Sequence, residues 1–321
     1  CVLGLVIGCA DDPGPADDDD VSGDDDDQGD DDATADDDDV GDDDDDDATA
    51  DDDDDVTVGI WSQVSGGRYH TCGVRNDTLV DCWGNDNYEQ STPATGFFTQ
   101  VSAGKYHSCG VQTDGTVACW GCDGEGYDYG QCDPPAGSFV QVVAARHHSC
   151  GVKADGSIAC WGCEGELAGY PGVFVDAGQC SPPAFTFTQV TAGDDHSCGL
   201  RDDGLVMCWG CGEPNEDYGQ CNSPDVVFTQ IDSDAYHSCG VLADGTADCW
   251  GSTSSGKADP PDGETFSMVS AGRHNSCGVL TSGEVSCWGC GDADYDVGQC
   301  DPPAGTFQHV ALGQAHGCGV D

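Results

Sequence analysis

The sequence is poor in basic side chains: 8 of its 321 residues are Lys or Arg, against 62 Asp and Glu. Binding to nucleic acid or to an anionic membrane surface depends on clustered Lys and Arg, and these few are scattered along the chain, so the composition argues against both partners. No apolar run approaches the roughly 20 residues that a membrane-spanning helix needs. Helical periodicity is absent as well, which directs the interpretation toward β structure.

The acidity is unevenly distributed along the chain. Residues 1–55 hold 28 of the acidic side chains and no Lys or Arg, whereas residues 56–321 hold all seven tryptophans and a regular apolar pattern. Only the second part can form a core. Residues 10–55 are runs of Asp broken by small residues, and mutual repulsion predicts a disordered, extended acidic linker. Calcium binding is the alternative, but the D-x-[DN]-x-[DN]-G-x5-E loop of a specific site is missing.

The first nine residues, CVLGLVIGC, resemble the end of a secretory signal's apolar region. Val6 to Cys9 further resembles a bacterial lipobox, which implies that Cys9 is lipidated and that the acidic tract is a tether. Modification of Cys1 is less favoured because it would leave an apolar heptad exposed, and a chance apolar run is the alternative. The three predicted segments are a signal remnant (1–9), the linker (10–55) and a repeat domain (56–321). We expect truncation at both ends, since an initiating Met is missing and the last repeat is incomplete.

A repeat organises the second part. Seven segments share the pattern His-x-Cys-Gly or a close variant, and their first cysteines fall at positions 72, 109, 150, 198, 239, 277 and 318. A period near 40 with turn residues indicates propeller blades or a solenoid. Within each unit, apolar residues alternate on both sides of a turn such as Asp155-Gly156, which predicts a β-hairpin.

The full unit, F-x-Q-V-x-A-G-x-x-H-S-C-G-V-x-x-D-G-x-V-x-C-W-G followed by G-Q, resembles the repeat of the regulator of chromosome condensation family, shared with the β-lactamase-inhibitor propeller. The resemblance covers Val56 to Asp321. It implies an all-β fold, a seven-bladed β-propeller of four-stranded antiparallel blades, with six complete repeats and the start of a seventh. Departures are the added cysteines, Asn275 at the histidine position, and Glu89-Gln90 and Gly256-Lys257 in place of Gly-Gln. The family's nuclear exchange-factor and chromatin role is not carried over, because export, acidity and cysteine content oppose it.

The cysteines are predicted to form disulfides within each unit. In six units a pair spans the hairpin turn, and opposed residues of antiparallel strands lie within disulfide range. A second pair follows Trp-Gly in four units, and units one and five lack both of its members. The hairpin pairs are Cys72 with Cys82, Cys109 with Cys119, Cys150 with Cys160, Cys198 with Cys208, Cys239 with Cys249, and Cys277 with Cys287; the loop pairs are Cys122 with Cys132, Cys163 with Cys180, Cys211 with Cys221, and Cys290 with Cys300.

Redox catalysis and zinc binding are the alternatives for these cysteines. The repeated C-W-G-C resembles a thioredoxin-type C-x-x-C, but here the motif ends a strand instead of opening a helix, where its thiol pKa would be lowered. Zinc held by four cysteines of one blade would leave the two-cysteine units incomplete, and an export signal favours oxidation. Disulfides are therefore favoured, and they leave Cys1, Cys9 and Cys318 unpaired.

Two further residue types recur once per unit. The histidines could form a symmetric metal-binding circle, but one per blade is more typical of a hydrogen-bonding element, and Asn275 interrupts the series. The tryptophans after the second hairpin cysteine are interpreted as inter-blade core. The histidines are His70, His107, His148, His196, His237 and His316; the tryptophans are Trp83, Trp120, Trp161, Trp209, Trp250 and Trp288.

No nucleophile or general base stands apart from the repeat, so we predict neither an enzyme nor a cofactor or metal. Variation concentrates in the loops after Trp-Gly, where aromatic residues lie among carboxylates, a composition that suits binding of a protein or other macromolecule, particularly a basic one. A merely soluble loop is the alternative. These candidates are Tyr127, Tyr129, Tyr170, Phe174, Tyr218 and Tyr295.

The function predicted from the sequence is that of a non-enzymatic binding scaffold outside the cytoplasm. We expect either a bacterial surface lipoprotein, in contact with the membrane only through its N-terminal lipid, or a secreted protein. A structural spacer of the envelope and a metal-binding propeller are the alternatives.

Overall fold

The computed structural model describes residues 6–7, 61–122, 128–165, 176–211, 218–291 and 298–321. The regular structure in these ranges is β-strand apart from one 3-10 turn at Ser254–Gly256. None of the described segments contains a helix long and apolar enough to cross a membrane. The predicted linker and Cys9 lie outside the described residues.

The described strands form seven three-stranded antiparallel sheets. They are β2 (Trp61–Gly66), β3 (His70–Arg75) and β4 (Val80–Gly84); β5 (Phe98–Ala103), β6 (Ser108–Gln112) and β7 (Val117–Trp120); β8 (Phe139–Ala144), β9 (Ser149–Lys153) and β10 (Ile158–Trp161); β11 (Phe187–Ala192), β12 (Ser197–Arg201) and β13 (Val206–Trp209); β14 (Phe228–Asp234), β15 (His237–Leu242) and β16 (Ala247–Gly251); β17 (Phe266–Ala271), β18 (Ser276–Leu280) and β19 (Val285–Trp288); and β20 (His309–Leu312) and β21 (Gly317–Val320) with β1 (Val6–Ile7).

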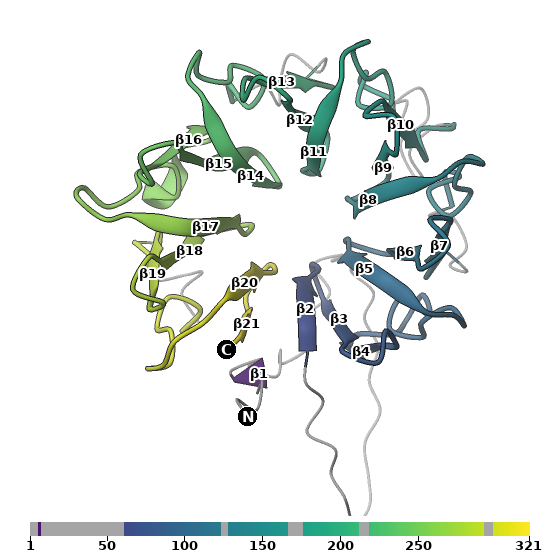
Figure 1. Ribbon diagram of the computed structural model, residues 1–321, viewed down its shortest axis with the longest axis horizontal. Coiled ribbons are helices and arrows are strands. Elements are labelled where there is room, and N and C mark those ends of the chain that lie inside the picture. The colour runs from purple at the N-terminus through teal and green to yellow at the C-terminus, as the bar shows by residue number, and fades with distance from the viewer. Residues whose placement is uncertain (1–5, 8–60, 123–127, 166–175, 212–217, 292–297) are drawn as a thin grey trace, which may run out of the picture. The chain divides into compact units, whose positions relative to one another are not determined.

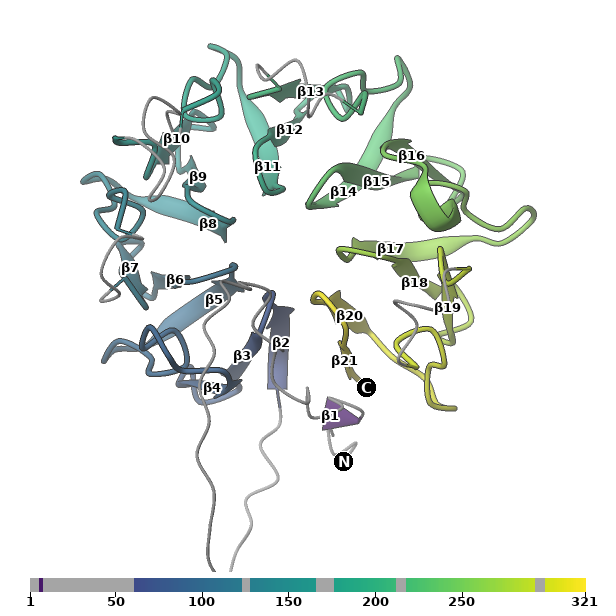
Figure 2. The ribbon, with the colours of Figure 1, turned by 180° about the vertical axis from the view of Figure 1, so that it is seen from behind.

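The sheets follow one another around a ring in chain order, and the first strand of each unit lies nearest the centre (Figures 1 and 2). The ring closes within the chain, because β2 contacts both β20 and β21. At this junction Val64 packs with Ala311, Cys318 and Val320. The predicted all-β, propeller-like architecture is therefore confirmed.

The prediction of four-stranded blades is not confirmed, since each sheet has three strands among the described residues. Unit one is described without a gap from Gly84 to Phe98, and turns occupy the segment expected to hold its fourth strand. Asp and Gly are abundant in these segments and are depleted in strands, which explains the local preference for turns.

The hairpin turns set the register that brings the cysteines together. In the third unit Gly156 takes a φ of 83°, and Asp155 Oδ1 accepts a hydrogen bond from Ser157 N at 3.0 Å. This turn places Cys150 directly opposite Cys160. All ten predicted pairs are disulfide-bonded in the structure, with Cα atoms 4.0 to 4.1 Å apart in the hairpin pairs and 6.1 Å apart in the loop pairs.

Cys318 corrects the prediction, because it is disulfide-bonded as well. The other twenty described cysteines pair among themselves, so its partner lies outside the described residues. The spacing rule placed its partner ten residues further along the same hairpin, past Asp321, and therefore left Cys318 unpaired.

The core is divided among the junctions between neighbouring sheets. At the second junction Cys109 and Val111 of β6 pack against Phe139 and Val142 of β8, and Trp161 covers them. The rings of Phe139 and Trp161 lie 6.0 Å apart in an edge-on arrangement. The predicted role as inter-blade core is confirmed for Trp120, Trp161, Trp209, Trp250 and Trp288, whereas Trp83 is only partly buried. Each buried indole stabilises one junction by removing a large apolar area from water.

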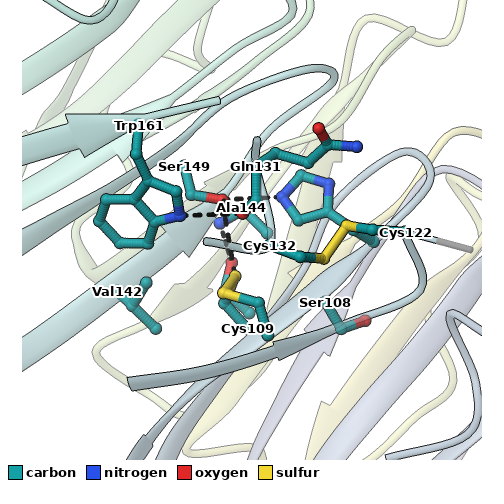
Figure 3. The surroundings of a disulfide bond; sticks show 12 residues. Ser108, Cys109, Cys122, Gln131, Cys132, Val142, Ala144, Ser149 and Trp161 are labelled. Carbon is teal, nitrogen blue, oxygen red and sulfur yellow. Dashed lines mark hydrogen bonds between the residues drawn. A yellow bond between two sulfur atoms is a disulfide. The ribbon is translucent and has the colours of Figure 1, made fainter. Parts of the chain in front are cut away.

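In the second to sixth units a backbone carbonyl of the preceding loop accepts a hydrogen bond from the tryptophan. The carbonyl of Gln131 accepts hydrogen bonds from Trp161 Nε1 at 2.9 Å and from Ser149 Oγ at 3.2 Å (Figure 3). His107 Nε2 lies 2.8 Å from the same Ser149 oxygen. Because the serine proton is directed at Gln131, the histidine must be the donor, which requires a proton on Nε2.

The histidine contact repeats around the ring. Five histidines reach the serine of the next sheet at 2.7 to 3.1 Å, and His316 reaches Thr71 Oγ1 at 2.9 Å. In the sixth unit the Asn275 amide lies 3.7 Å from Cys277 Sγ of its own sheet. Burial lowers the pKa of His70, His107 and His148 to about 3, so these imidazoles are neutral. The predicted role as a hydrogen-bonding element is confirmed, and the bond runs between blades.

Candidate functional site

A cavity of about 250 Å³ follows the axis of the ring and is lined by the first strands of all seven sheets. Its wall carries a glutamine at the third position of most of these strands. Gln100, for example, donates to the carbonyl of Val142 and accepts from the N–H of the same residue, both at 2.9 Å. Five such amide bridges join neighbouring inner strands among the described residues. The glutamines are Gln63, Gln100, Gln141, Gln189 and Gln230, and the bridges measure 2.7 to 3.0 Å.

The last two sheets carry other residues at the bridging position, namely Met268 and His309. Neither offers the amide pair that bonds to both backbone groups of the next strand. His309 Nδ1 is buried without a hydrogen-bond partner, and burial lowers the pKa of this imidazole to about 4. The two junctions of the seventh sheet therefore lack the amide bridge.

The turn between the first and second strands of each unit carries one side chain at the end of the channel, two residues before the histidine position. We call these seven residues the mouth ring: Arg68, Lys105, Arg146, Asp194, Ala235, Arg273 and Gln314. Four of them are cationic, which is half of the eight Lys and Arg in the chain. The sequence-based description of the basic residues as scattered is therefore wrong, because folding stacks one repeat position around one axis.

Two of the mouth-ring cations are paired with carboxylates. Arg273 Nη1 lies 2.9 Å from Asp194 Oδ2. The turn of the fifth unit lies between these two units in the ring, and its Ala235 has only a methyl group. Arg146 Nη1 lies 4.0 Å from Asp195 Oδ2. Burial alone would raise the pKa of Asp194, but the guanidinium groups of Arg273 and Arg146 hold it below its ordinary value. This carboxylate is therefore ionised.

Lys105 is the unusual member of the ring. It is 9% exposed, and its Nζ lies 4.5 Å from the centre of the Tyr106 ring. In the part of the chain that the structure describes, no carboxylate lies within ion-pair distance of this ammonium. Burial and then the charges of Arg146 and Arg68 lower the pKa of Lys105 to about 7.

The described parts of the loops after Trp-Gly lie on the same face as the mouth ring. Because the three strands of a sheet are antiparallel, the loop after the third strand begins at the end where the first turn lies. Aromatic contacts confirm this placement: the Tyr88 and Tyr106 rings are 5.4 Å apart, and the Tyr218 and Tyr236 rings are 5.1 Å apart. We call the mouth ring and the loops after Trp-Gly together the mouth face.

The structure separates the predicted loop residues. Tyr129 is 5% exposed and packs edge-on against His147 at 5.0 Å, so its ring supports the loop and is not open to a partner. Tyr218 is 51% exposed on the mouth face. The other predicted residues, Tyr127, Tyr170, Phe174 and Tyr295, lie outside the described residues.

The loop disulfides fasten the base of each variable loop. Cys122 is bonded to Cys132, the residue that follows the acceptor Gln131 (Figure 3). In unit one Asn85 and Ser91 occupy the equivalent positions, and Ser91 Oγ donates to the carbonyl of Asn85 at 2.9 Å. A hydrogen bond thus replaces the staple in this shorter loop, which explains why both cysteines are missing together.

The described residues do not form a metal-binding site. No group of three or more His, Cys, Asp or Glu side chains within the described ranges could hold a metal ion. The histidines that could form a ring are already engaged with the next sheet, as described above. Sequence analysis missed the mouth ring, although the alternation of Arg, Lys and Asp at one repeat position was a usable signal.

Comparison with known proteins defines the class first. Residues 61–90, 98–131 and 187–220 match the model of the regulator of chromosome condensation (RCC1) repeat. The chain therefore contains repeats of this family within a β-propeller, as the sequence predicted. No curated protein matches the chain.

Solved structures share the same fold. The CRINKLY WD40 ectodomain of the receptor kinase ACR4 from Arabidopsis thaliana is 26% identical, with a TM-score of 0.57 over 72% of this chain and 80% of that one. The ectodomain of the receptor kinase CR4 from Physcomitrella patens is 22% identical, with a TM-score of 0.63 over 81% and 70%. Prp20p from Saccharomyces cerevisiae is 16% identical, with a TM-score of 0.66 over 83% of both chains. The last two likenesses show the fold alone.

Proposed function

We propose that the protein is a non-enzymatic, extracytoplasmic binding protein, a closed seven-bladed propeller that presents its mouth face to a macromolecular partner. One observation carries this proposal: the variable loops and half of the chain's cations lie on one face, and disulfides fasten the loop bases. Binding residues typically lie on variable loops that a rigid scaffold positions.

Two observations support a location outside the cytoplasm. The ten disulfides described above form and persist in oxidising compartments. The Arabidopsis structure, which is 26% identical, is a receptor ectodomain. A partner that is basic at its periphery would suit the acidic loops that surround the mouth.

A bacterial surface anchor through Cys9 is the finer proposal. Anchored protein would incorporate labelled palmitate at Cys9. Protein without label would reject the anchor.

Site-specific photo-crosslinking tests the binding function. A photoreactive phenylalanine analogue would replace Tyr218 on the mouth face, and a matched variant would carry it at Phe97, which is 59% exposed at the opposite end of the ring. We expect a saturable adduct with a macromolecule of the extracytoplasmic fraction from position 218 and none from position 97. Adducts from both positions alike, or from neither, would favour a structural spacer and reject the proposal.

A further inference from the structure

The cationic side of the mouth ring holds more positive charge than its neighbours neutralise. Arg68, Lys105 and Arg146 come from three consecutive sheets, and Lys105 lies between the two arginines in the ring. The carboxylates Asp194 and Asp195 lie beyond Arg146, on the fourth sheet. The charges of Arg146, Arg68 and Arg273 therefore act against the ammonium of Lys105, and Asp194 is the opposing carboxylate. No carboxylate lies within ion-pair distance of this ammonium in the described structure.

The bonds made by the two arginines leave this side open to an anion. Arg68 Nε donates to the neutral amide of Gln314, so it gains no compensating charge there. Arg146 Nε is buried without a hydrogen-bond partner, and its pairing with Asp195 is long at 4.0 Å. A buried donor without an acceptor is costly, and a cluster of like charges adds to that cost.

We propose that the cationic side of the mouth ring binds a carboxylate of an acidic peptide segment, held by the Lys105 ammonium and the guanidinium groups of Arg146 and Arg68. This deepens the proposed function by naming the chemistry of the bound partner. A carboxylate supplies acceptors for charge-assisted hydrogen bonds to both types of donor. Its charge also removes the repulsion that the three cations exert on one another.

The surroundings select a short acidic segment over a nucleic acid. The chain carries a formal charge of -54, so a long polyanion is repelled by the molecule as a whole. A carboxylate side chain that enters the mouth is attracted locally, while salt screens the distant repulsion beyond roughly 8 Å at physiological ionic strength. The cavity volume of about 250 Å³ suits a side chain and not a folded element.

Two sources carry the same chemistry, namely a partner's acidic segment and the Asp-rich residues 10–55 of this chain. The first experiment titrates the full chain with tetra-aspartate at 0.15 M salt and uses tetra-asparagine as the uncharged control. We expect saturable binding of tetra-aspartate alone, weakened about tenfold or more in Lys105→Met. The matched variant Lys153→Met removes the same charge from an outer hairpin and should bind like the parent chain.

A second readout follows Lys105 itself. The chain has three lysines, Lys105, Lys153 and Lys257, so carbon-13 methylation of their amino groups gives a simple NMR spectrum that the two variants assign. With the mouth empty, Lys105 should titrate near pH 7, and tetra-aspartate should raise its pKa by at least about one unit. A raised value before any peptide is added, returning to about 7 in 1 M salt, identifies residues 10–55 as the occupant.

The outcomes separate this inference from the broader proposal. Binding of tetra-aspartate or occupation by residues 10–55 supports a carboxylate site, whatever the crosslinking from Tyr218 shows. The inference is overturned if Lys105 titrates near 7 and does not respond to the peptide. Equal weakening by Lys105→Met and Lys153→Met, or equal binding of tetra-asparagine, would overturn it as well.

Discussion

Two positions in the same turn behave in opposite ways across the repeats. The histidine position is occupied by His in six of seven units, whereas the mouth-ring position two residues earlier holds Arg, Lys, Asp, Ala or Gln. In six units the residue before the mouth-ring position donates its N–H to the carbonyl of the histidine position, whereas in the fifth unit β14 extends to Asp234 and Ala235 takes a φ of 43°. The histidine is uniform because each one bonds to the next sheet. The mouth-ring position makes no contact that repeats from unit to unit, since Arg68 donates to Gln314 whereas Arg273 pairs with Asp194. The uniform position therefore identifies the contacts that hold neighbouring sheets together, which we call the joints. The variable, charged position beside it identifies the candidate binding site.

The largest expected effect is at a joint. Trp161→Ala should lower the free energy of unfolding by about 3 to 5 kcal/mol, since it removes a buried indole that is 8% exposed and leaves a cavity at the second junction. Guanidinium unfolding followed by far-ultraviolet circular dichroism would measure it. Arg146→Gln, at the mouth, is the control and should cost far less. An equal loss of unfolding free energy in the two variants would contradict the proposed difference between joint and mouth-ring positions.

The loop staples should rank next. Replacing Cys211 and Cys221 together by Ala opens a loop closed over ten residues, which costs about 3 kcal/mol in the chain-entropy account. The carbonyl of Gln220, next to Cys221, accepts from Trp250 at 3.0 Å, so the joint should loosen as well. Thermal unfolding of the double variant would show the loss. An unchanged midpoint would mean that the hydrogen bonds at the loop base suffice, as they do in unit one.

The neutral histidines should make stability depend on pH. Burial lowers the pKa of His196 to about 4, below its unfolded value of 6.5, so its contribution is complete above pH 6.5 and is lost as the pH falls toward 4. Each such histidine should add a slope of about 1.4 kcal/mol per pH unit in this window. His196→Asn, which copies Asn275, should reduce the slope measured by unfolding at pH 7, 6 and 5. A slope identical to that of the parent chain would contradict the buried neutral state.

The smallest effect on stability is expected at the mouth, and its sign is reversed. Lys105→Met should raise the free energy of unfolding by on the order of 1 kcal/mol at pH 7, because it removes a desolvated charge beside two like charges. The same guanidinium titration, with Lys153→Met as reference, would detect the gain. A clear loss would indicate that Lys105 holds the ring together.

The repeat made the contacts within and between sheets predictable from the sequence, but it did not predict that the mouth-ring charges lie together. Cys150 and Cys160 could be paired because a turn centred on Asp155 puts them opposite each other within one hairpin. Lys105 and Arg146 are 41 residues apart, and only closure of the ring brings their charges to one axis. Burial of Tyr129 depends on His147 in the next unit, so composition alone marked it as a surface residue.

The missing amide bridges at Met268 and His309 give the ring a seam. Opening a closed ring requires only one junction to separate, and a junction without the amide bridge should separate at a lower free energy than one that has it. The amide hydrogens of β20 and β21 should therefore exchange with solvent sooner than those of β11 and β12. We therefore expect the seventh sheet to open locally while the other six sheets keep the mouth ring in place.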